Sequence, residues 1–563
     1  MLNSATGTPN FDRWLNKFFD FYYRHRPVNA TFIGVHDYDG ALPDFSASGI
    51  GDTLADMQSL LRQAASLSDE SLNPAQRIDK RLCEGFLQIQ CWEYEQEHCV
   101  RRNPGLYINE AIFGVLATFL TDYAPLRERV EVAAQRLHAI PDLLRQGQDN
   151  LRQAPAAWIR HAIVECRGAI AFLDYGAMLA PGQLISGSYS EGVARATRAF
   201  HKFGGYLDGL LEDPGPQCHG CGEEILSLHL GEAHCFEQDA NDIVSYAEDQ
   251  LAKASRHLDE HCFDFDAGSP ADALAKLYEI HPTVDEYYGR YQEIWHDVQR
   301  IAEESDLLTW PEFPIRYVPI PTWARAGAPD LYFLNYRSPA AFGRPPTHDY
   351  LVTPIDTGMP AARQLELLRA NNDSVIRLNH VVHHGGIGHH VQNWHAFRSS
   401  SRVGQIAAVD CASRIAMNCG GTMAEGWACY ATDLIAEAGG LTPLEVYAEY
   451  RTRARMCARA IVDIRLHQGR LSFDQAVDFY VRNAGMSENA ATYEATRNSM
   501  YPGSALMYLT GCDAIHELRA KLQALQQNRF DLRQFHDKFL SYGSLPVALI
   551  ARAMLEEENQ AGQ

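Results

Sequence analysis

Hydrophobic residues near the amino terminus of the chain recur with the spacing of one helix face. They are Phe11, Trp14, Leu15, Phe18, Phe19 and Tyr22. Longer stretches with helical periodicity follow at 75–98, 124–153, 187–212, 240–260 and 270–302. Because apolar residues that return every three to four positions mark amphipathic helices, the pattern predicts a mainly α protein.

One segment departs from this pattern and is typical of short strands. Residues 313–321 and 330–336 are rich in β-branched and aromatic side chains, with prolines in the first run. Proline cannot donate to a sheet ladder, so these strands are expected at a sheet edge. Such an edge would either pair with an extended substrate backbone or form a small structural hairpin.

No segment rich in proline, glycine and serine divides the 563 residues into self-contained blocks. No internal repeat or low-complexity stretch is evident either. We therefore expect one unit over residues 1–563, built from two interlocked helical lobes around a cleft, with approximate bounds 1–305 and 306–563.

The charge balance limits the partners of the protein. Lys and Arg number 49 against 71 Asp and Glu, a formal net charge of −22, and no basic block interrupts the acidic excess. Nucleic acid and anionic membrane surfaces demand clustered positive charge, so neither is an expected partner. No apolar run approaches the roughly 20 residues of a membrane span, and the first ten residues do not resemble a signal peptide. We expect a cytoplasmic protein, of open oligomeric state.

Cysteines add a weaker signal. Most of the 13 sit in apolar helical patterns, as Cys83 and Cys457 do, which is typical of reduced core residues. Cys218 and Cys221 form one CxxC pair that resembles half of a structural zinc site. Because the second pair is missing, an ordinary surface loop is favoured.

Six of the 23 histidines lie between His380 and His395, far more than an even spread would place in so short a segment. Imidazole binds zinc, iron, nickel and copper, and catalytic metals take several such ligands from one segment plus a carboxylate from elsewhere. Glu425, in Ala-Glu-Gly-Trp-Ala, is a carboxylate of this kind. The segment therefore predicts a metal site rather than a merely polar helix.

Spacing restricts which histidines can share an ion. On a regular helix His380 and His384 lie on one face and form one possible pair. His383 and His389 would be turned roughly 240° apart and displaced by about 9 Å on a straight helix. The glycines between them permit the kink that would bring the second pair together, and they are Gly385, Gly386 and Gly388.

These residues carry a family resemblance. The chain resembles a bacterial metallopeptidase-like family, domain of unknown function 885, with the signature His-Glu-x-x-Pro-Gly-His-His-x-Gln followed by Glu-Gly-Trp-Ala. The matching positions are His383, Gly388, His389, His390, Gln392, Glu425, Gly426, Trp427 and Ala428. Further matches are Pro27, Thr31, Gly34 and His36 near the start, and Arg459, Asp463, His467, Arg497, Pro502, Gly503, Tyr508 and Gly511 near the end. The resemblance covers almost the whole chain.

The resemblance implies a large, two-lobed, helical fold of the gluzincin type, with a small β edge element beside a central cleft. It also implies one divalent metal, zinc, on His383, His389 and Glu425. His467 and Tyr508 would then act on a substrate oxyanion, and Arg497 and Asp463 would serve substrate binding. The alternative for these four residues is buried, hydrogen-bonded support.

The sequence differs from the family signature at the position of the catalytic base and at one further position. His384 stands where the family has the glutamate that serves as general base, and Ile387 stands where it has proline. His384 can act as the base, which keeps zinc and hydrolysis, or as a further ligand, which favours iron or manganese.

We therefore expect a metal-dependent enzyme that acts on a small amino-acid-derived or peptide-like substrate. Because of His384 we expect it to have diverged from ordinary peptide hydrolysis, toward a redox or lyase step. A zinc metallopeptidase or amidohydrolase with His384 as base is the first alternative. An inactive relative that binds a peptide or metabolite is the second.

Overall fold

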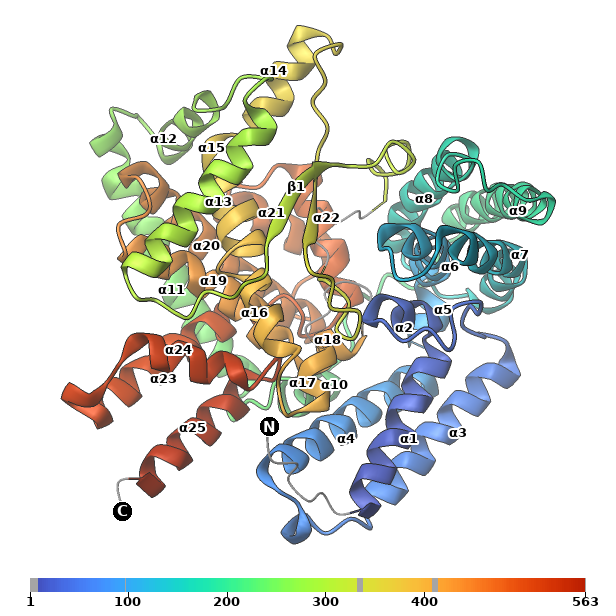
Figure 1. Cartoon of the computed structure of the whole chain (residues 1–563), viewed down its shortest axis with the longest axis horizontal. Coiled ribbons are helices and arrows are strands. Elements are labelled where there is room, and N and C mark those ends of the chain that lie inside the picture. Colours follow the sequence, from blue (N-terminus) through green and yellow to red (C-terminus); the bar gives the residue numbers. More distant parts are fainter. Residues whose placement is uncertain (1–8, 97, 332–337, 408–413, 562–563) are drawn as a thin grey trace. The chain divides into compact units, whose positions relative to one another are not determined.

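The computed structural model describes residues 9–96, 98–331, 338–407 and 414–561. In these ranges the chain is mainly helical, as the sequence predicted (Figure 1). None of the described helices is both long and apolar enough to cross a membrane. The chain divides into two compact units. The first contains Met1–His219, Ile320–Leu334 and Pro339–Arg344, and the second contains Gly220–Pro319, Asn335–Ser338 and Pro345–Gln563.

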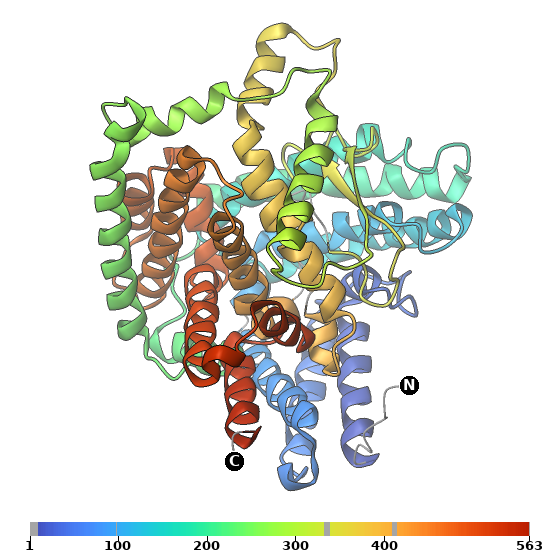
Figure 2. The ribbon, with the colours of Figure 1, turned by 60° about the vertical axis from the view of Figure 1, so that its left-hand side comes forward.

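This division differs from the predicted lobe boundary near residue 305. The chain passes from one unit to the other after His219, because the segment that follows packs on the carboxy-terminal helices. Helix α11 (Ala240–His261) runs along α20 (Pro443–His467), which Figure 2 shows as a long green helix beside brown ones. Tyr447 of α20 donates a hydrogen bond to the carbonyl of Leu258, at 2.7 Å. Helical periodicity does not reveal that α11 packs on α20, so the sequence alone could not group these two helices.

The first unit is a set of helices around an aliphatic and aromatic core. Its α-helices are α1 (Pro9–His25), α2 (Pro27–Ile33), α3 (Ala47–Ala64), α4 (Pro74–Glu95), α5 (His98–Arg102), α6 (Pro104–Leu120), α7 (Leu126–Asn150), α8 (Ala156–Ala171) and α9 (Gly187–Glu212). Leu137 and Ile140 of α7 meet Phe200 and Phe203 of α9 in this core. The predicted amino-terminal helix is α1, and its apolar face is buried.

The second unit holds the histidine segment and the carboxy-terminal helices. Its α-helices besides α11 and α20 are α10 (Glu223–Leu228), α12 (Pro270–Ala275), α13 (Tyr287–Glu304), α14 (Ala361–Ala370), α15 (Asp373–Val375), α16 (His389–Ala396), α17 (Arg402–Ile406), α18 (Arg414–Cys419), α19 (Gly421–Glu437), α21 (Phe473–Ala484), α22 (Glu488–Met500), α23 (Met507–Gln526), α24 (Leu532–Ser541) and α25 (Val547–Ala561). Helix α19 packs along α23.

Both units contain short 3-10 turns and π-helical segments. The 3-10 turns are Asp69–Ser71, Cys262–Phe265, Lys276–Glu279 and Gln527–Arg529, and the π-helical segments are Phe172–Gly176, His229–Ala233 and Ile376–Gly385.

The predicted helical stretches correspond closely to α4, α7, α9 and α11. The fifth, 270–302, is interrupted, because α12 ends at Ala275 and α13 begins only at Tyr287. Pro282 lies in the gap, and proline lacks an amide hydrogen and disfavours helical backbone in the preceding residue.

A small β element is present, as expected, but it is not the hairpin that was one of the two alternatives. Strand β1 (Ile315–Pro319) lies within the predicted 313–321 run, but its partner is β2 (His348–Val352), and the two strands are parallel. Of the second predicted run, residues 332–337 lie outside the described residues. Parallel pairing needs a long connection, which local sequence patterns do not reveal.

Candidate metal centre

The helical path is broken by a tight turn between His383 and His389. The π-helix Ile376–Gly385 carries His383 and His384, and α16 begins at His389 after a turn through glycine. In this turn the amide of Gly388 donates to the carbonyl of Val382 at 2.8 Å, and a Cβ on Gly388 would lie 2.0 Å from the carbonyl oxygen of His383. Only glycine allows so close an approach. The structure thus contains the kink that the glycines predicted.

The turn brings three imidazoles together. One ring nitrogen each of His383, His384 and His389 lies within 4.8 Å of the other two. Glu425 Oε2 lies 3.5 Å from His383 Nε2 and 3.9 Å from His389 Nε2. Ligands bound at about 2.0–2.2 Å to one ion are separated by roughly 3–3.6 Å, so small side-chain shifts would close this set. The donor set fits a divalent metal.

Hydrogen bonds orient two of the rings. His384 Nδ1 lies 2.7 Å from the carbonyl oxygen of Asn379, which can only accept, so Nδ1 carries the proton and Nε2 keeps the lone pair. His389 Nδ1 lies 3.4 Å from Gln392 Oε1, while the amide of Gln392 donates to Ser544 at 2.6 Å. His389 Nε2 is therefore also the nitrogen with a lone pair, as in metal-bound histidines that donate through the other nitrogen.

The Glu-Gly-Trp segment of α19 places the carboxylate. Trp427 Nε1 donates to the carbonyl of Ile387 at 2.9 Å, in the turn between the two histidine helices. Gly426 lies against the backbone of Gly511 on α23, where a Cβ would come within 2.4 Å of the Gly511 carbonyl carbon. Glu425 is the candidate ligand, and its two neighbours fix the turn and the adjoining helix.

Burial and mutual proximity shape the electrostatics. Burial raises the pKa of Glu425, but the hydrogen bond with His383 and the charges of His389 and Arg459 outweigh it and lower the pKa to about 2. Burial, followed by the neighbouring imidazoles, holds the pKa of His384 well below its usual value. The Glu425 carboxylate is thus ionised and the His384 imidazole is neutral, and these are the forms in which both residues bind metals.

Two of the three other histidines of the segment, His380 and His390, have different partners. His380 Nδ1 shares a 2.6 Å hydrogen bond with the hydroxyl of Tyr350 on β2, so the alternative pair of His380 with His384 is not the one that the structure assembles. His390 donates from Nε2 to the carbonyl of Phe313 at 2.7 Å and stacks on its ring. Both histidines connect the π-helix region to the β element.

His467 and Asp463 lie buried in α20, where each contacts backbone. His467 Nε2 donates to the carbonyl of Asn498 at 2.9 Å, and its Nδ1 accepts from the amide of Cys221 at 3.2 Å. Both ring nitrogens make hydrogen bonds to backbone groups, which fits the alternative that His467 is a buried, hydrogen-bonded support. Cys218, the other half of the CxxC pair, is exposed.

The carboxylate of Asp463 holds the loop that leads into α23. It accepts from the amides of Gly503, Ala505 and Leu506 at 2.8–3.1 Å. Burial raises the pKa of Asp463 to about 7 against the lowering effect of these donors. Asp463 is therefore a positioning residue for the helix that carries Tyr508.

Tyr508 belongs to a charged group that the sequence indicated only in part. The guanidinium of Arg459 pairs with both carboxylate oxygens of Glu494, at 2.8 and 3.0 Å, and lies 4.5 Å from the centre of the Tyr508 ring. Arg497, half-buried on α22, acts electrostatically on Glu494. Glu494 was missed, because its pairing with Arg459 across α20 and α22 has no local pattern; its spacing of three residues from Arg497 was the available signal.

Comparison with known proteins assigns the family. No curated protein matches the chain. A solved structure described as "a putative lipoprotein of unknown function from Shewanella oneidensis" is 22% identical, with a TM-score of 0.75 over 98% of this chain and 100% of that one. A second, the "putative lipoprotein from Colwellia psychrerythraea", is 16% identical, with a TM-score of 0.75 over 98% and 99%. At these identities the likeness shows the fold alone. The family model described as "Bacterial protein of unknown function (DUF885)" matches residues 27–554, and the chain belongs to this family.

Proposed function

We propose that the protein is a metalloenzyme that binds one divalent ion through His383, His384, His389 and Glu425. The observation that carries the proposal is the convergence of three imidazole nitrogens within 4.8 Å, with the Glu425 carboxylate at 3.5 and 3.9 Å from two of them. Imidazole and carboxylate together suit zinc, iron and manganese. A bound ion would supply Lewis acidity and, if it is iron or manganese, one-electron chemistry.

We further propose that His384 is a ligand and that the reaction is not ordinary peptide hydrolysis. The carbonyl of Asn379 holds Nδ1 of His384, which leaves Nε2 as its lone-pair nitrogen. In zinc peptidases a carboxylate that does not bind the metal usually accepts the proton of the attacking water, whereas Glu425 faces His383 and His389. A small amino-acid-derived or peptide-like substrate is the class that we propose.

The chain's own residues suggest how such a substrate would be held. Tyr508 has a hydroxyl suited to donate to a substrate carboxylate or to a developing oxyanion. Arg459 lies over the ring of Tyr508 and acts electrostatically on Glu425, so positive charge lies close to both. Asp463 acts indirectly, by holding the loop before α23.

Metal analysis of the purified full-length protein tests the centre. We expect one equivalent at this site in the wild type and a marked loss in Glu425→Gln, because the amide replaces an anionic ligand. Glu437→Gln, on the same helix in a surface pair with Arg519, is the matched control and should keep the metal. Equal metal content in Glu425→Gln and wild type would overturn the proposed ligand set.

The role of His384 has its own readout. In copper(II)-loaded protein, pulsed electron paramagnetic resonance should detect one fewer coupled imidazole in His384→Ala than in the wild type. An unchanged number would make His384 a non-ligand. Robust metal-dependent cleavage of ordinary peptides by the wild type would overturn the proposal that the reaction is not peptide hydrolysis. Peptidase activity gained in His384→Glu would support this proposal.

A further inference from the structure

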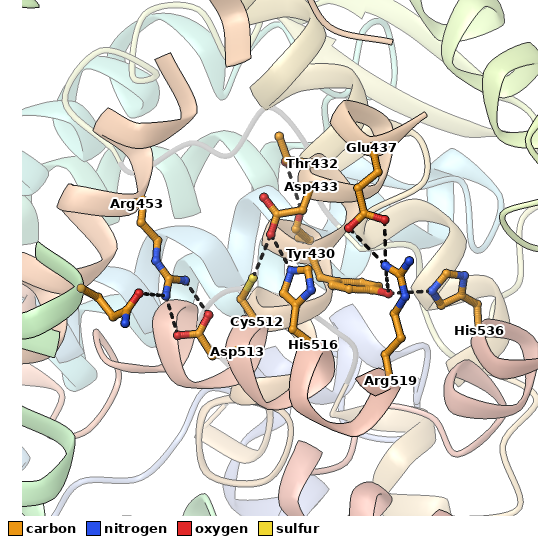
Figure 3. Close-up of polar contacts among 12 residues, drawn as sticks. Tyr430, Thr432, Asp433, Glu437, Arg453, Cys512, Asp513, His516, Arg519 and His536 are labelled. Atoms are coloured by element: carbon orange, nitrogen blue, oxygen red, sulfur yellow. Dashed lines mark hydrogen bonds and ion pairs between the residues drawn. The ribbon is translucent and has the colours of Figure 1, made fainter. Parts of the chain in front are cut away.

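A second group of ligand-type side chains lies along the seam between α19 and α23. Asp433 Oδ2 is 2.8 Å from His516 Nε2 and 3.5 Å from Cys512 Sγ, and one potential ligand atom of each residue lies within 4.8 Å of the others. Figure 3 shows the thiol and the imidazole both directed at the Asp433 carboxylate. Cys512 and His516 are four residues apart and so share a face of α23.

We propose that Asp433, Cys512 and His516 form a second metal site, selective for zinc or a similar thiophilic divalent ion. Thiolate, imidazole and carboxylate are the three protein ligand types of zinc. From their usual bond lengths, oxygen and sulfur on one tetrahedral zinc lie roughly 3.5 Å apart, and oxygen and nitrogen roughly 3.3 Å. The first separation is already present, and the second needs an opening of about half an ångström. Three protein ligands leave the fourth position to water.

The surroundings suit a cation that enters from solvent. The side chains of His516 and Asp433 are 36% and 43% exposed, whereas Cys512 is buried. An ion can therefore reach the carboxylate and imidazole first and meet the sulfur on the inner side. Binding would release the thiol proton of Cys512 to water, and the imidazole of His516 would exchange its proton on Nε2 for one on Nδ1 through water, which leaves Nε2 to bind the ion.

Neighbouring cations do not neutralise the cluster, because each has its own carboxylate. Arg453 pairs with Asp513, with one contact at 2.8 Å, and Arg519 pairs with Glu437 at 2.8 Å. Figure 3 shows these two pairs on either side of the cluster. The carboxylate of Asp433 thus remains available for an added positive charge.

The second site is separate from the histidine centre but shares a helix with it. Asp433 follows Glu425 by eight residues on α19, which corresponds to about 12 Å along the axis. On α23, Cys512 follows Tyr508 by one helical turn. An ion at the second site would therefore fasten the helix that carries the Glu425 ligand to the helix that carries Tyr508, and we assign it a structural, stabilising role.

The sulfur ligand provides a test that the histidine centre cannot imitate. Full-length protein freed of metal is titrated with cobalt(II), and near-ultraviolet absorption is recorded, where thiolate bound to cobalt gives an intense charge-transfer band. We expect this band in the wild type and its loss in Cys512→Ser, with one fewer bound equivalent. Cys218→Ser, which removes an exposed thiol, is the matched control and should keep the band.

A second measurement guards against misfolding of the Cys512 variant. His516→Ala keeps the thiol but removes a ligand, so it should weaken zinc binding at this site at least tenfold and abolish the rise in melting temperature that zinc gives through it. Absence of a thiolate band in the wild type, or a band that persists in Cys512→Ser, would leave only a hydrogen-bonded Asp–His pair and overturn the proposal. Glu425→Gln should keep the band, so failure of the histidine centre is recognised separately.

Discussion

The indole Nε1 of Trp427 donates a hydrogen bond to the carbonyl oxygen of Ile387 at 2.9 Å. Ile387 lies in the turn that returns His389 toward His383, and Trp427 lies two residues after Glu425. One side chain therefore ties the carboxylate helix to the histidine turn. The Glu-Gly-Trp-Ala motif thus carries the candidate ligand Glu425 and a hydrogen bond that holds the histidine turn as a brace.

Trp427→Phe should weaken this brace. The variant loses the hydrogen bond to a buried carbonyl and part of a fully buried ring, so we expect a loss of about 2–4 kcal/mol of stability. Metal affinity should fall as well, because the histidine turn is less well held. Trp394→Phe, the same change at a half-buried position on α16, should cost less and keep the metal. Thermal melting and metal titration measure both effects, and unaltered affinity in Trp427→Phe would contradict the role of the brace.

Asp463→Asn should destabilise the loop before α23. An amide nitrogen replaces one of the two oxygens that accept from Gly503, Ala505 and Leu506, so at least one buried amide loses its acceptor. We expect a cost of about 1–3 kcal/mol, measured by urea unfolding. Asp478→Asn, in a solvent-exposed pair with Arg482, should change stability by less than about 0.5 kcal/mol. Equal effects of the two variants would mean that the loop does not depend on Asp463.

Tyr508→Phe should separate catalysis from structure. It removes one hydroxyl and keeps the ring on which Arg459 lies, so folding and metal content should stay as in the wild type. Turnover or substrate affinity should fall by at least tenfold if the hydroxyl contacts the substrate. The surface change Tyr493→Phe should leave both unaltered. Metal loss in proportion to activity would assign Tyr508 to the support of the centre instead.

Acid should destabilise the fold through its buried neutral histidines. Burial lowers the pKa of His234 and of His536 to about 4, from 6.5 in the unfolded chain. Below pH 6.5 the unfolded chain binds protons that the folded chain refuses, so stability present above that pH is lost as pH falls toward 4. Each histidine contributes up to about 3 kcal/mol to this loss. Melting temperatures between pH 7.5 and 4.5 should therefore fall steeply.

His536→Gln provides the internal check of the pH effect. His536 accepts from the hydroxyl of Tyr430 at 2.9 Å and donates to the carbonyl of Leu307, so it is neutral in the fold. The glutamine variant should be less stable at pH 7.5 but should lose less stability between pH 6.5 and 4.5. A parallel pH profile in variant and wild type would show that His536 does not titrate on unfolding.

Local sequence determined five longer helices of the amino-terminal half and the composition of the histidine site. Helical periodicity located α1, α4, α7, α9 and α11 because an amphipathic helix must turn one face to a core, whatever that core is. The glycines before His389 predicted a kink. Only glycine, which lacks a Cβ, allows the backbone at residue 388 to lie so close to the carbonyl of His383. Ligand-type residues clustered in sequence because they share one turn.

Tertiary structure alone decided which groups meet. The chain divides after His219 because α11 packs on α20, and β1 pairs in parallel with β2 across a long connection. The ring of His467 is held between two backbone groups, and Asp433 meets Cys512 and His516 across two packed helices. These contacts join residues far apart in the chain, and their partners are selected by packing and hydrogen-bond satisfaction over the whole unit, which periodicity and spacing do not encode.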